Sequence, residues 1–371
     1  LLAIPLFTFA GYLLSEGGTS KRLVRFSRSL FGWVPGGLGV VALVTCSFFT
    51  AITGATGITI IALGGLLLPA LLAEKYKENF SLGLMTTSGS LGLHFPPSLP
   101  IILYGFVSGA SIEKLFMAGV IPGALMVGIL CLFSVFMGRK WRLERPPFSV
   151  SEFLFALKYA AWELPIPMLI IIGIYSGFCT ATEAAVLTVV YVLLIKTIVF
   201  RELSLVRDIP RVMKESVKMV GGIMIILGAA LGFTNYLVDA FIPMKILQFL
   251  EGMVQSKIGF LLILNFFLIL VGCAMDIFSA ILIVVPLIVP LANRFGIDPI
   301  HLGIIFLANL GIGYNTPPVG LNLFIASSRF DRSIVQLYKA TLPFLLLLLF
   351  TLLLITYWPA LSLFLPGLLK G

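Results

Sequence analysis

Long apolar stretches run through this chain, and short segments between them hold most of the charged residues. The stretches cover residues 1–14, 33–49, 57–73, 80–109, 115–138, 164–178, 184–200, 219–240, 258–273, 277–292, 301–328 and 340–360. A membrane helix needs about 20 apolar residues, whereas the strands of a membrane β-barrel alternate apolar and polar residues. The continuous runs therefore predict an all-helical integral membrane protein with many crossings.

Two pairs of apolar arms are predicted to form re-entrant hairpins. The arms at 33–49 and 57–73 are each somewhat shorter than the about 20 residues of a comfortable crossing. The tip between them, residues 50–57, is small, hydroxyl-rich and uncharged, unlike a solvated loop. Residues 258–292 form a second pair with its tip at 272–276. Two tilted full crossings remain an alternative for the first pair.

Two further apolar runs contain a pair of prolines, at Pro96-Pro97 and Pro317-Pro318. Proline lacks an N–H and clashes with the carbonyl one turn earlier, so a helix cannot continue unbroken through either pair. Broken backbone inside a membrane is tolerated where it lines a polar cavity or is buried in protein. The sequence therefore predicts two broken helices, at residues 80–109 and 301–328.

The two proline pairs lie 221 positions apart, and other landmarks repeat at the same offset. Gly92 corresponds to Gly313, Pro69 to Pro290, and Gly11 to Gly232. We expect two repeats, residues 1–110 and 219–330, with scaffold helices and amphipathic arms at 111–218 and a membrane helix at 331–371. Interrupted hydrophobic segments at matching positions of two halves are typical of a transporter site.

Charge counting supports opposite orientations for the repeats. The chain has 59% hydrophobic and 11% charged residues and a net charge of +9, with 25 Lys and Arg residues. With the 139–145 loop in the cytoplasm and each hairpin returning to its own side, all but five of these cations lie inside. The exceptions are Lys114, Lys245, Lys257, Arg294 and Lys370. The basic balance thus reflects cytoplasmic loops, and no nucleic-acid partner is expected.

The breaks and tips offer oxygen atoms to a cation. Unwound backbone leaves carbonyl groups free at Gly92 and Phe95, and at Gly313 and Thr316. Hard cations such as Na⁺ prefer oxygen ligands. Hydroxyl groups on the first tip can complete a site, and these are Thr53 and Thr56.

The same breaks can attract an anion. Helices that resume near Ser98 and Val319 present their N-termini, where negative charge is favoured. Side chains that can contact substrate oxygens are Thr56, Ser98, Asn315 and Asn322. The alternative for both breaks is a purely structural kink.

Four ionisable residues are candidates, and three of them have two interpretations each. Asp276 lies in an apolar run, where a charge costs at least ~2.5 kcal/mol unless partnered; it can serve transport, cap the next helix, or do both. His94 either binds a substrate carboxylate or packs in the core. His301 is expected as a solvated residue at a helix start. Glu183 either caps the helix near residue 184 or takes part in transport.

Sequence motifs for catalysis are missing. There is no HExxH, no Walker loop and no usable Ser/His/Asp set, and the four cysteines lack metal or disulfide spacing. We therefore expect no enzyme, no organic cofactor and no metal beyond sodium.

The chain resembles the large membrane subunit of tripartite ATP-independent periplasmic (TRAP) transporters, dicarboxylate type. The resemblance covers nearly the whole chain. It rests on Ala3-Ile4-Pro5-Leu6-Phe7, Pro35-Gly36-Gly37-Leu38, Pro96-Pro97-Ser98-Leu99-Pro100, Leu115-Phe116-Met117-Ala118-Gly119, Thr182-Glu183-Ala184-Ala185, Gly296-Ile297-Asp298-Pro299 and Thr316-Pro317-Pro318-Val319-Gly320-Leu321-Asn322. The family usually has more sequence before residue 1, so a truncated chain is expected.

The resemblance implies an elevator-type, Na⁺-coupled importer in a bacterial inner membrane. Its substrate would be a C4-dicarboxylate, sialic acid or a related carboxylate, delivered by a periplasmic substrate-binding protein. A small four-helix membrane subunit would buttress the scaffold within the lipid bilayer. The alternatives are a stand-alone ion or organic anion permease and, outside transport by a carrier, an intramembrane enzyme or a channel.

The resemblance also implies where sodium binds, at the contact of each hairpin tip with a broken helix. The implied residues are Thr53, Ala55, Gly92, Phe95 and Pro97 in the first repeat, and Ala274, Asp276, Gly313, Thr316 and Pro318 in the second. Two features depart from the family. Its usual Ser-Gly-Ser tip is Thr53-Gly54-Ala55 here, and its usual Gly-Pro is Gly92-Leu93, followed by His94.

Overall fold

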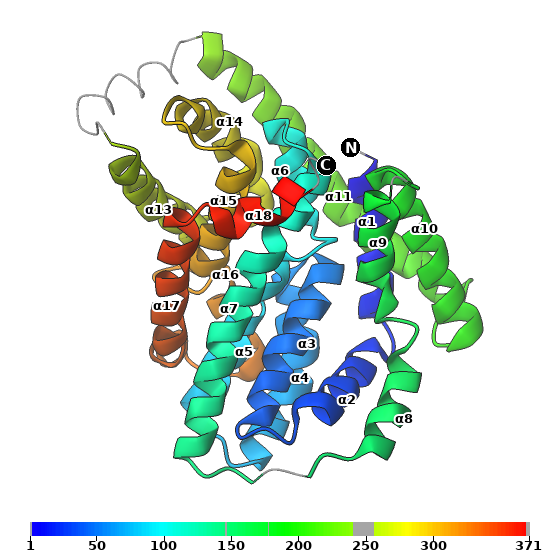
Figure 1. Ribbon diagram of the computed structural model, residues 1–371. Helices are drawn as coiled ribbons and strands as arrows, with labels where there is room; N and C mark the ends of the chain where they lie inside the picture. Colours follow the sequence, from blue (N-terminus) through cyan, green and yellow to red (C-terminus); the bar gives the residue numbers. More distant parts are fainter. Residues whose placement is uncertain (1, 145–146, 177, 240–255, 369–371) are drawn as a thin grey trace.

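All regular elements in the described part of the chain are helices, as the apolar pattern predicts (Figure 1). The computed structural model describes residues 2–144, 147–176, 178–239 and 256–368. Six helices within these residues are long and apolar enough to cross a membrane, or up to eight if each bent helix pair is one span. The protein is therefore a multi-pass membrane protein.

The first hairpin consists of α3 (Gly37–Thr53) and α4 (Thr56–Ala73), and the second of α13 (Lys257–Ala274) and α14 (Ile277–Arg294). Two residues form each tip, Gly54-Ala55 and Met275-Asp276. Both bounds of α14 lie 221 positions after those of α4, which is the offset of the proline pairs. The second arm of each hairpin therefore has the same length and the same place in the sequence pattern.

The first broken helix comprises α5 (Glu78–Ser88), the 3₁₀ turn η1 (Leu91–His94) and α6 (Leu99–Ser108), with a bend of 46° before α6. The second comprises α15 (Pro299–Gly313) and α16 (Leu321–Phe330). Each proline pair lies in the non-helical stretch between the two halves, as expected from the missing N–H groups.

Long helices follow each broken helix. They are α7 (Ile112–Lys140) in the first half of the chain and α17 (Ile334–Tyr357) in the second. A short helix, α18 (Ala360–Leu368), follows Pro359 and packs across α7 and the start of α15. Cover by α18 explains why the expectation for His301 was wrong. That side chain is 1% exposed, and its Nδ1 lies 2.7 Å from the Ser362 hydroxyl.

A second group of helices stands beside this body (Figure 1). It contains α1 (Ala3–Ser15), α9 (Pro165–Tyr175), α10 (Ala181–Leu194, continued by the π-helix η2, Ile195–Val199) and α11 (Asp208–Asp239), and α1 packs against α10 and α11. The sequence predicts amphipathic arms up to residue 218 and an apolar run over 219–240. Instead α11 is one helix that begins at Asp208 and continues across this boundary to Asp239, and no proline follows Pro210 within it.

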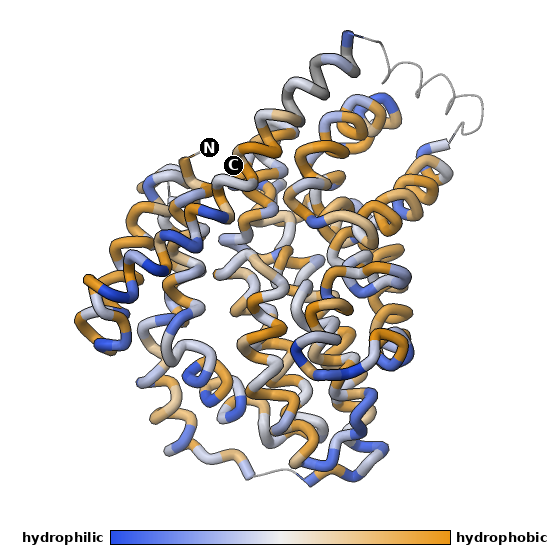
Figure 2. Tube along the Cα trace, turned by 180° about the vertical axis from the view of Figure 1, so that it is seen from behind, coloured by the Kyte–Doolittle hydropathy of each residue, from blue (hydrophilic) through white to orange (hydrophobic). Residues whose placement is uncertain are grey.

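Two short helices run along the lower end of the molecule in Figure 1, α2 (Thr19–Phe31) and α8 (Val150–Ala160). They pack against each other and connect the two groups of helices. In Figure 2 hydrophobic residues dominate the long helices, whereas hydrophilic residues gather at this lower end. A surface helix with one apolar and one charged face is typical of the membrane interface.

Candidate functional site

The tips of the two hairpins line one cavity of about 330 Å³. The first tip contributes Gly54, Ala55 and Thr56, and the second contributes Asp276 and Ile277. The two tips are more than 200 positions apart in the sequence, so the repeat arrangement brings them together. This cavity is the candidate site.

The remaining walls come from the broken helix and from the second group of helices. Tyr314 and Leu321 belong to the second broken helix, while Tyr12 and Met219 belong to α1 and α11. The Tyr12 hydroxyl lies 3.5 Å from the Met219 sulfur, so these two side chains close one wall together. The cavity therefore lies at the boundary between the hairpin body and the helices that stand beside it.

A network of hydroxyl groups shapes the first tip. Gly54 has a positive φ of 66° and its N–H binds the Thr50 carbonyl, which ends α3 in a tight turn. The Thr50 hydroxyl lies 2.6 Å from that of Thr59 on the other arm and 2.9 Å from the Gly89 carbonyl. The sequence analysis missed Thr50 and Thr59, although Thr50 belongs to the hydroxyl-rich stretch at residues 50–57 and Thr59 follows it by two positions. Thr53 bonds only within its own helix, to the Phe49 carbonyl.

Asp276 caps the helix that follows the second tip. One of its carboxylate oxygens accepts hydrogen bonds from the N–H groups of Phe278, at 3.0 Å, and Ser279, at 3.1 Å. Its other oxygen accepts the Ser279 hydroxyl. The Tyr314 phenol accepts the N–H of Ile277. Both interpretations of Asp276 are thus compatible, because the carboxylate that caps α14 also lines the cavity.

Three helices begin at the cavity. Thr56, Ile277 and Leu321 are the first residues of α4, α14 and α16, and all three line it. Asp276 neutralises the N-terminus of α14, but no side-chain cap is present at α4 or α16. Two uncapped N-termini and one carboxylate therefore face the same space, which suits an anion next to a cation.

Glycines let each hairpin touch its broken helix. A Cβ atom on Gly92 would lie 2.7 Å from the backbone nitrogen of Ala51 in α3. A Cβ atom on Gly313 would lie 2.8 Å from the backbone nitrogen of Cys273 in α13. Both glycines were predicted sodium ligands, and both lie where the tip meets the break. The two repeats build the same contact.

The carbonyl oxygens predicted to bind sodium each accept one hydrogen bond, and each keeps a second lone pair free for another partner. Gly92 accepts from Phe95 at 3.1 Å, Phe95 from Ser98 at 3.1 Å, and Gly313 from Thr316 at 2.9 Å. The Thr316 carbonyl lies 3.2 Å from the Cys273 sulfur of the second tip. A carbonyl oxygen can serve two partners, so these bonds leave room for a cation.

The structure separates the predicted substrate residues into two groups. Thr56 lines the cavity, whereas Ser98, Asn315 and Asn322 are fully buried outside its lining. The Asn315 amide donates to the Ser90 hydroxyl at 3.1 Å and receives a hydrogen bond from Asn322 at 3.3 Å. These side chains join the two broken helices. Their contact with a substrate stays a prediction.

Two other candidates occupy structural positions. His94 is fully buried, and neither ring nitrogen has a partner among the described residues. Its backbone packs against Gly119 and its Cβ against Gly123, both of α7. Glu183 forms a capping box with Thr180, accepting the Thr180 N–H at 2.7 Å. The capping interpretation of Glu183 agrees with this geometry.

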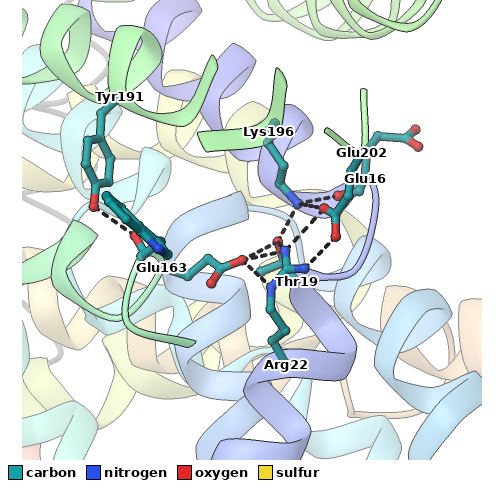
Figure 3. A network of polar contacts seen from close by, with 8 residues as sticks. Glu16, Thr19, Arg22, Glu163, Tyr191, Lys196 and Glu202 are labelled. Atoms are coloured by element: carbon teal, nitrogen blue, oxygen red, sulfur yellow. Dashed lines mark hydrogen bonds and ion pairs between the residues drawn. The ribbon is translucent and has the colours of Figure 1, made fainter. Parts of the chain in front are cut away.

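A buried ion cluster, which the sequence analysis did not predict, joins the helices at the lower end (Figure 3). Lys196, fully buried in the π-helix η2, donates to Thr19 at 2.6 Å and to Glu202 at 3.0 Å. Arg22 of α2 pairs with Glu163 at 2.6 Å and with Glu202. Lys196 is the only charged residue in the apolar run at 184–200. A charge in such a run is costly, so it indicates that the side chain has a charged or polar partner.

The cluster holds Glu202 in its charged form. Burial by itself raises the pKa of this carboxyl, but hydrogen bonds from Arg22 and Lys196 outweigh burial and lower it to about 2. The Glu202 carboxylate also occupies the space where a Cβ on Gly17 or Gly18 would lie. The turn between α1 and α2 therefore packs directly on the cluster.

The described residues contain no group of three or more His, Cys, Asp or Glu residues that could hold a transition metal. The cavity instead offers the Thr56 hydroxyl, the Asp276 carboxylate and helix N-termini, while the predicted carbonyl ligands Gly92, Phe95, Gly313 and Thr316 lie outside its lining. Such a site can bind an alkali cation and an organic anion without changing either chemically. Together with paired hairpins and broken helices, it defines an integral membrane transporter.

The family follows from comparison with known proteins. Residues 1–361 match the family described as the tripartite ATP-independent periplasmic transporter, DctM component, and the chain belongs to this family. It is 37% identical to the C4-dicarboxylate TRAP transporter large permease protein DctM of Rhodobacter capsulatus, across 100% of this chain and 87% of that protein. The TRAP resemblance seen in the sequence is thereby confirmed.

The names of other relatives mention different substrates. The isethionate TRAP transporter permease protein DctMQ of Oleidesulfovibrio alaskensis is 37% identical over 99% of this chain, which spans 58% of that protein. The ectoine/5-hydroxyectoine large permease protein UehC of Ruegeria pomeroyi is 33% identical over 99% of this chain and 86% of its own length. Among solved structures, the YdaH transporter of Alcanivorax borkumensis matches with a TM-score of 0.68 at 14% identity, covering 96% and 85% of the chains. That likeness concerns the fold.

Proposed function

We propose that this protein is the membrane subunit of a sodium-coupled secondary importer of organic acids in a bacterial inner membrane. The observation that carries the proposal is the cavity between the hairpin tips, with Asp276 and the uncapped N-termini of α4 and α16 at its wall. Membership of the TRAP family supports the class of transport.

Sodium would bind at the contact between each tip and its broken helix. In the first repeat the oxygens come from the backbone of Thr53, Ala55, Gly92, Phe95 and Pro97. In the second they come from Ala274, Asp276, Gly313, Thr316 and Pro318. The close packing at Gly92 and Gly313 supports this proposal, because it brings tip and break within the few ångströms that one cation can bridge.

The substrate would be a small carboxylate held at the N-termini of α4 and α16. Thr56 supplies a hydroxyl at the first of these, and Ile58 and Ile61 give the cavity an apolar side. The names of the relatives above support an anionic or zwitterionic solute, since they mention a C4-dicarboxylate, isethionate and ectoine. Sialic acid belongs to the same chemical class. A bound sodium ion would attract the substrate carboxylate, so sodium binding would favour substrate binding.

Transport would occur by an elevator movement of the hairpin body against α1 and α11. Tyr12 and Met219 form the cavity wall that belongs to α1 and α11. The hairpin tips form the wall that belongs to the moving body. A site at such a boundary can open to either side of the membrane while the contacts between the tips and the broken helices stay intact.

The cargo would arrive on a periplasmic substrate-binding protein, and a small four-helix membrane subunit would support α9 and α10. The relative named DctMQ and the family description support this arrangement. The alternative is a stand-alone permease that needs no binding protein. Both readings share the cavity and differ in the partner.

Uptake by proteoliposomes separates these alternatives. The protein is reconstituted with its small subunit, and labelled C4-dicarboxylate, isethionate and ectoine are supplied with and without the cognate binding protein. We expect uptake of one of these solutes only with the binding protein. Equal uptake without it would favour the stand-alone permease and contradict the tripartite assembly.

A further inference from the structure

A basic and aromatic cavity lies at the lower end of the molecule, far along the chain from the hairpin tips. It has a volume of about 430 Å³ and lies between α2 and the segment that begins α8. Arg25 and Arg28 of α2 line it, together with Trp33, Phe148 and Glu152. None of these side chains takes part in the proposed transport site.

Helix α2 has the properties of a helix that lies along a membrane surface. Its 13 residues are too few to cross a bilayer, and it contains no acidic residue. Lys21, Arg25 and Arg28 form one exposed stripe, while Leu23 and Ser27 face the protein. A short helix with a basic stripe binds the headgroups of anionic lipids.

The surroundings identify the leaflet. Other exposed cations lie at the same end, in the last turn of α7 and in the loops after α4 and α7: Lys75, Lys77, Arg139, Lys140 and Arg142. Such clustering marks the cytoplasmic side, and anionic lipids concentrate in the cytoplasmic leaflet. The cavity therefore opens where phosphate headgroups are found.

The arginines in the cavity have carboxylate partners that are exposed to solvent. Arg25 donates two hydrogen bonds to Glu152, at 2.7 and 3.2 Å, with side chains 49% and 46% exposed, and its guanidinium lies 4.3 Å from the centre of the Phe155 ring. Arg28 pairs with Glu74 at 2.7 Å, with side chains 52% and 29% exposed. Exposed ion pairs contribute about 0–1 kcal/mol each unless their geometry is two-pronged. A phosphate can likewise accept two parallel hydrogen bonds from one guanidinium, so it can compete with Glu74 for Arg28 and with Glu152 for Arg25.

The aromatic pair distinguishes a lipid from free phosphate. The rings of Trp33 and Phe148 meet edge to face at 6.5 Å and are each 48% exposed. The indole N–H of Trp33 already donates to the Leu30 carbonyl, so the exposed part of the ring is apolar. An apolar surface beside two arginines suits a phosphate that continues into glycerol and acyl chains.

We propose that this cavity binds the phosphate headgroup of an anionic phospholipid, with Arg25 and Arg28 on the phosphate and Trp33 and Phe148 beside the glycerol. Glu74 ends the second arm of the first hairpin, so a headgroup on Arg28 replaces the bond that ties α2 to that hairpin. Bound lipid thus changes how the hairpin body is restrained. The proposal does not depend on the transported solute.

The test is lipid binding by the purified protein in detergent, measured by native mass spectrometry. Phosphatidylglycerol, phosphatidylethanolamine and inorganic phosphate are titrated against the wild type, R25Q/R28Q and the matched pair R139Q/K140Q. We expect preferential binding of phosphatidylglycerol that weakens about tenfold in R25Q/R28Q, as loss of a charge-assisted hydrogen bond would give, and stays unchanged in R139Q/K140Q. If R25Q/R28Q does not fold, R25K/R28K is used instead. It keeps the positive charges but loses the planar guanidinium groups that donate two parallel hydrogen bonds, and the same weakening of phosphatidylglycerol binding is expected.

Three results would overturn the proposal. Equal weakening in both double variants would indicate non-specific attraction to the basic end. Equal binding of phosphatidylethanolamine would remove the role of lipid charge. Displacement of the lipid by inorganic phosphate at similar concentration would identify a phosphate site instead.

Discussion

The backbone of Gly313 packs so closely on Gly272 that a Cβ atom on Gly313 would lie 2.6 Å from the Gly272 carbonyl carbon. This contact joins the end of α15 to the second hairpin just before its tip. In the first repeat Gly92 approaches α3 in the same way, near Thr50 and Ala51. Only glycine allows backbones to approach this closely, so both contacts fix the tips against the breaks.

Replacing Gly313 or Gly92 by alanine is expected to abolish most transport. The methyl group would force tip and break apart, and displacement of about 1 Å at a binding site costs tenfold or more in rate. Overpacking also lowers stability by about 1–3 kcal/mol. The matched control is Gly128→Ala on α7, where a Cβ meets no atom within 4 Å. Comparable loss of uptake in the control would show that the glycine contacts carry no special role.

Asp276 can be tested with its capping role kept intact. Asparagine caps helices about as well as aspartate, so Asp276→Asn should leave the thermal unfolding temperature nearly unchanged. Removing the charge should abolish the sodium dependence of uptake, measured as initial rate against Na⁺ concentration. Asp276→Ala should in addition lose about 1 kcal/mol of stability. An unchanged sodium dependence in a folded Asp276→Asn protein would refute a ligand role.

The hydroxyl of Thr50 is expected to stabilise the first tip. Thr50→Val removes its contacts with Thr59 and with the Gly89 carbonyl and takes a donor from that buried carbonyl, which costs about 1–3 kcal/mol. Thr45 is a matched control, because it is buried in the same helix and its hydroxyl has no partner among the described residues. Thermal unfolding in detergent should show a lower midpoint for Thr50→Val than for Thr45→Val. Equal midpoints would mean that the hydroxyl network does not hold the tip.

The ion cluster predicts a dependence of stability on pH. The folded state lowers the pKa of Glu202 from 4.5 to about 2, so its stabilising effect is complete above about pH 5 and disappears as pH falls toward 2. Wild-type unfolding temperatures should therefore decrease over this range. Glu202→Gln should start lower at pH 7 and lose less on acidification. Exposed Glu144 gives the control, and Glu144→Gln should follow the wild type.

Much of the architecture was predictable because membrane helices reveal themselves by apolar length and proline position. The hairpins and broken helices appear near their predicted bounds, since a proline pair stops a helix wherever it stands. The continuous helix α11 was not foreseen, because its amphipathic start and its apolar remainder were predicted as separate segments, although charge alone does not end a helix. Burial of His301 depends on α18, which lies 60 residues later in the sequence.

The site was predictable at the level of the tips and breaks. Thr56 and Asp276 lie at the cavity, whereas Asn315 and Asn322 bind each other and the opposite broken helix. Local sequence cannot distinguish a polar side chain that faces a cavity from one that joins two helices. Glu163 and Glu202 escaped notice because their partners, Arg22 and Lys196, come from distant segments.

Accumulation of labelled substrate in proteoliposomes under an imposed sodium gradient tests the central claim most directly. The complete system contains this protein, the small subunit and the binding protein, with equal osmolarity and no other ion gradient. We predict that inward sodium drives the internal concentration above the external one, and that collapsing the gradient releases the substrate. Equilibration to equal concentrations, with or without sodium, would contradict a sodium-coupled carrier and the assignment of the hairpin cavity as its site.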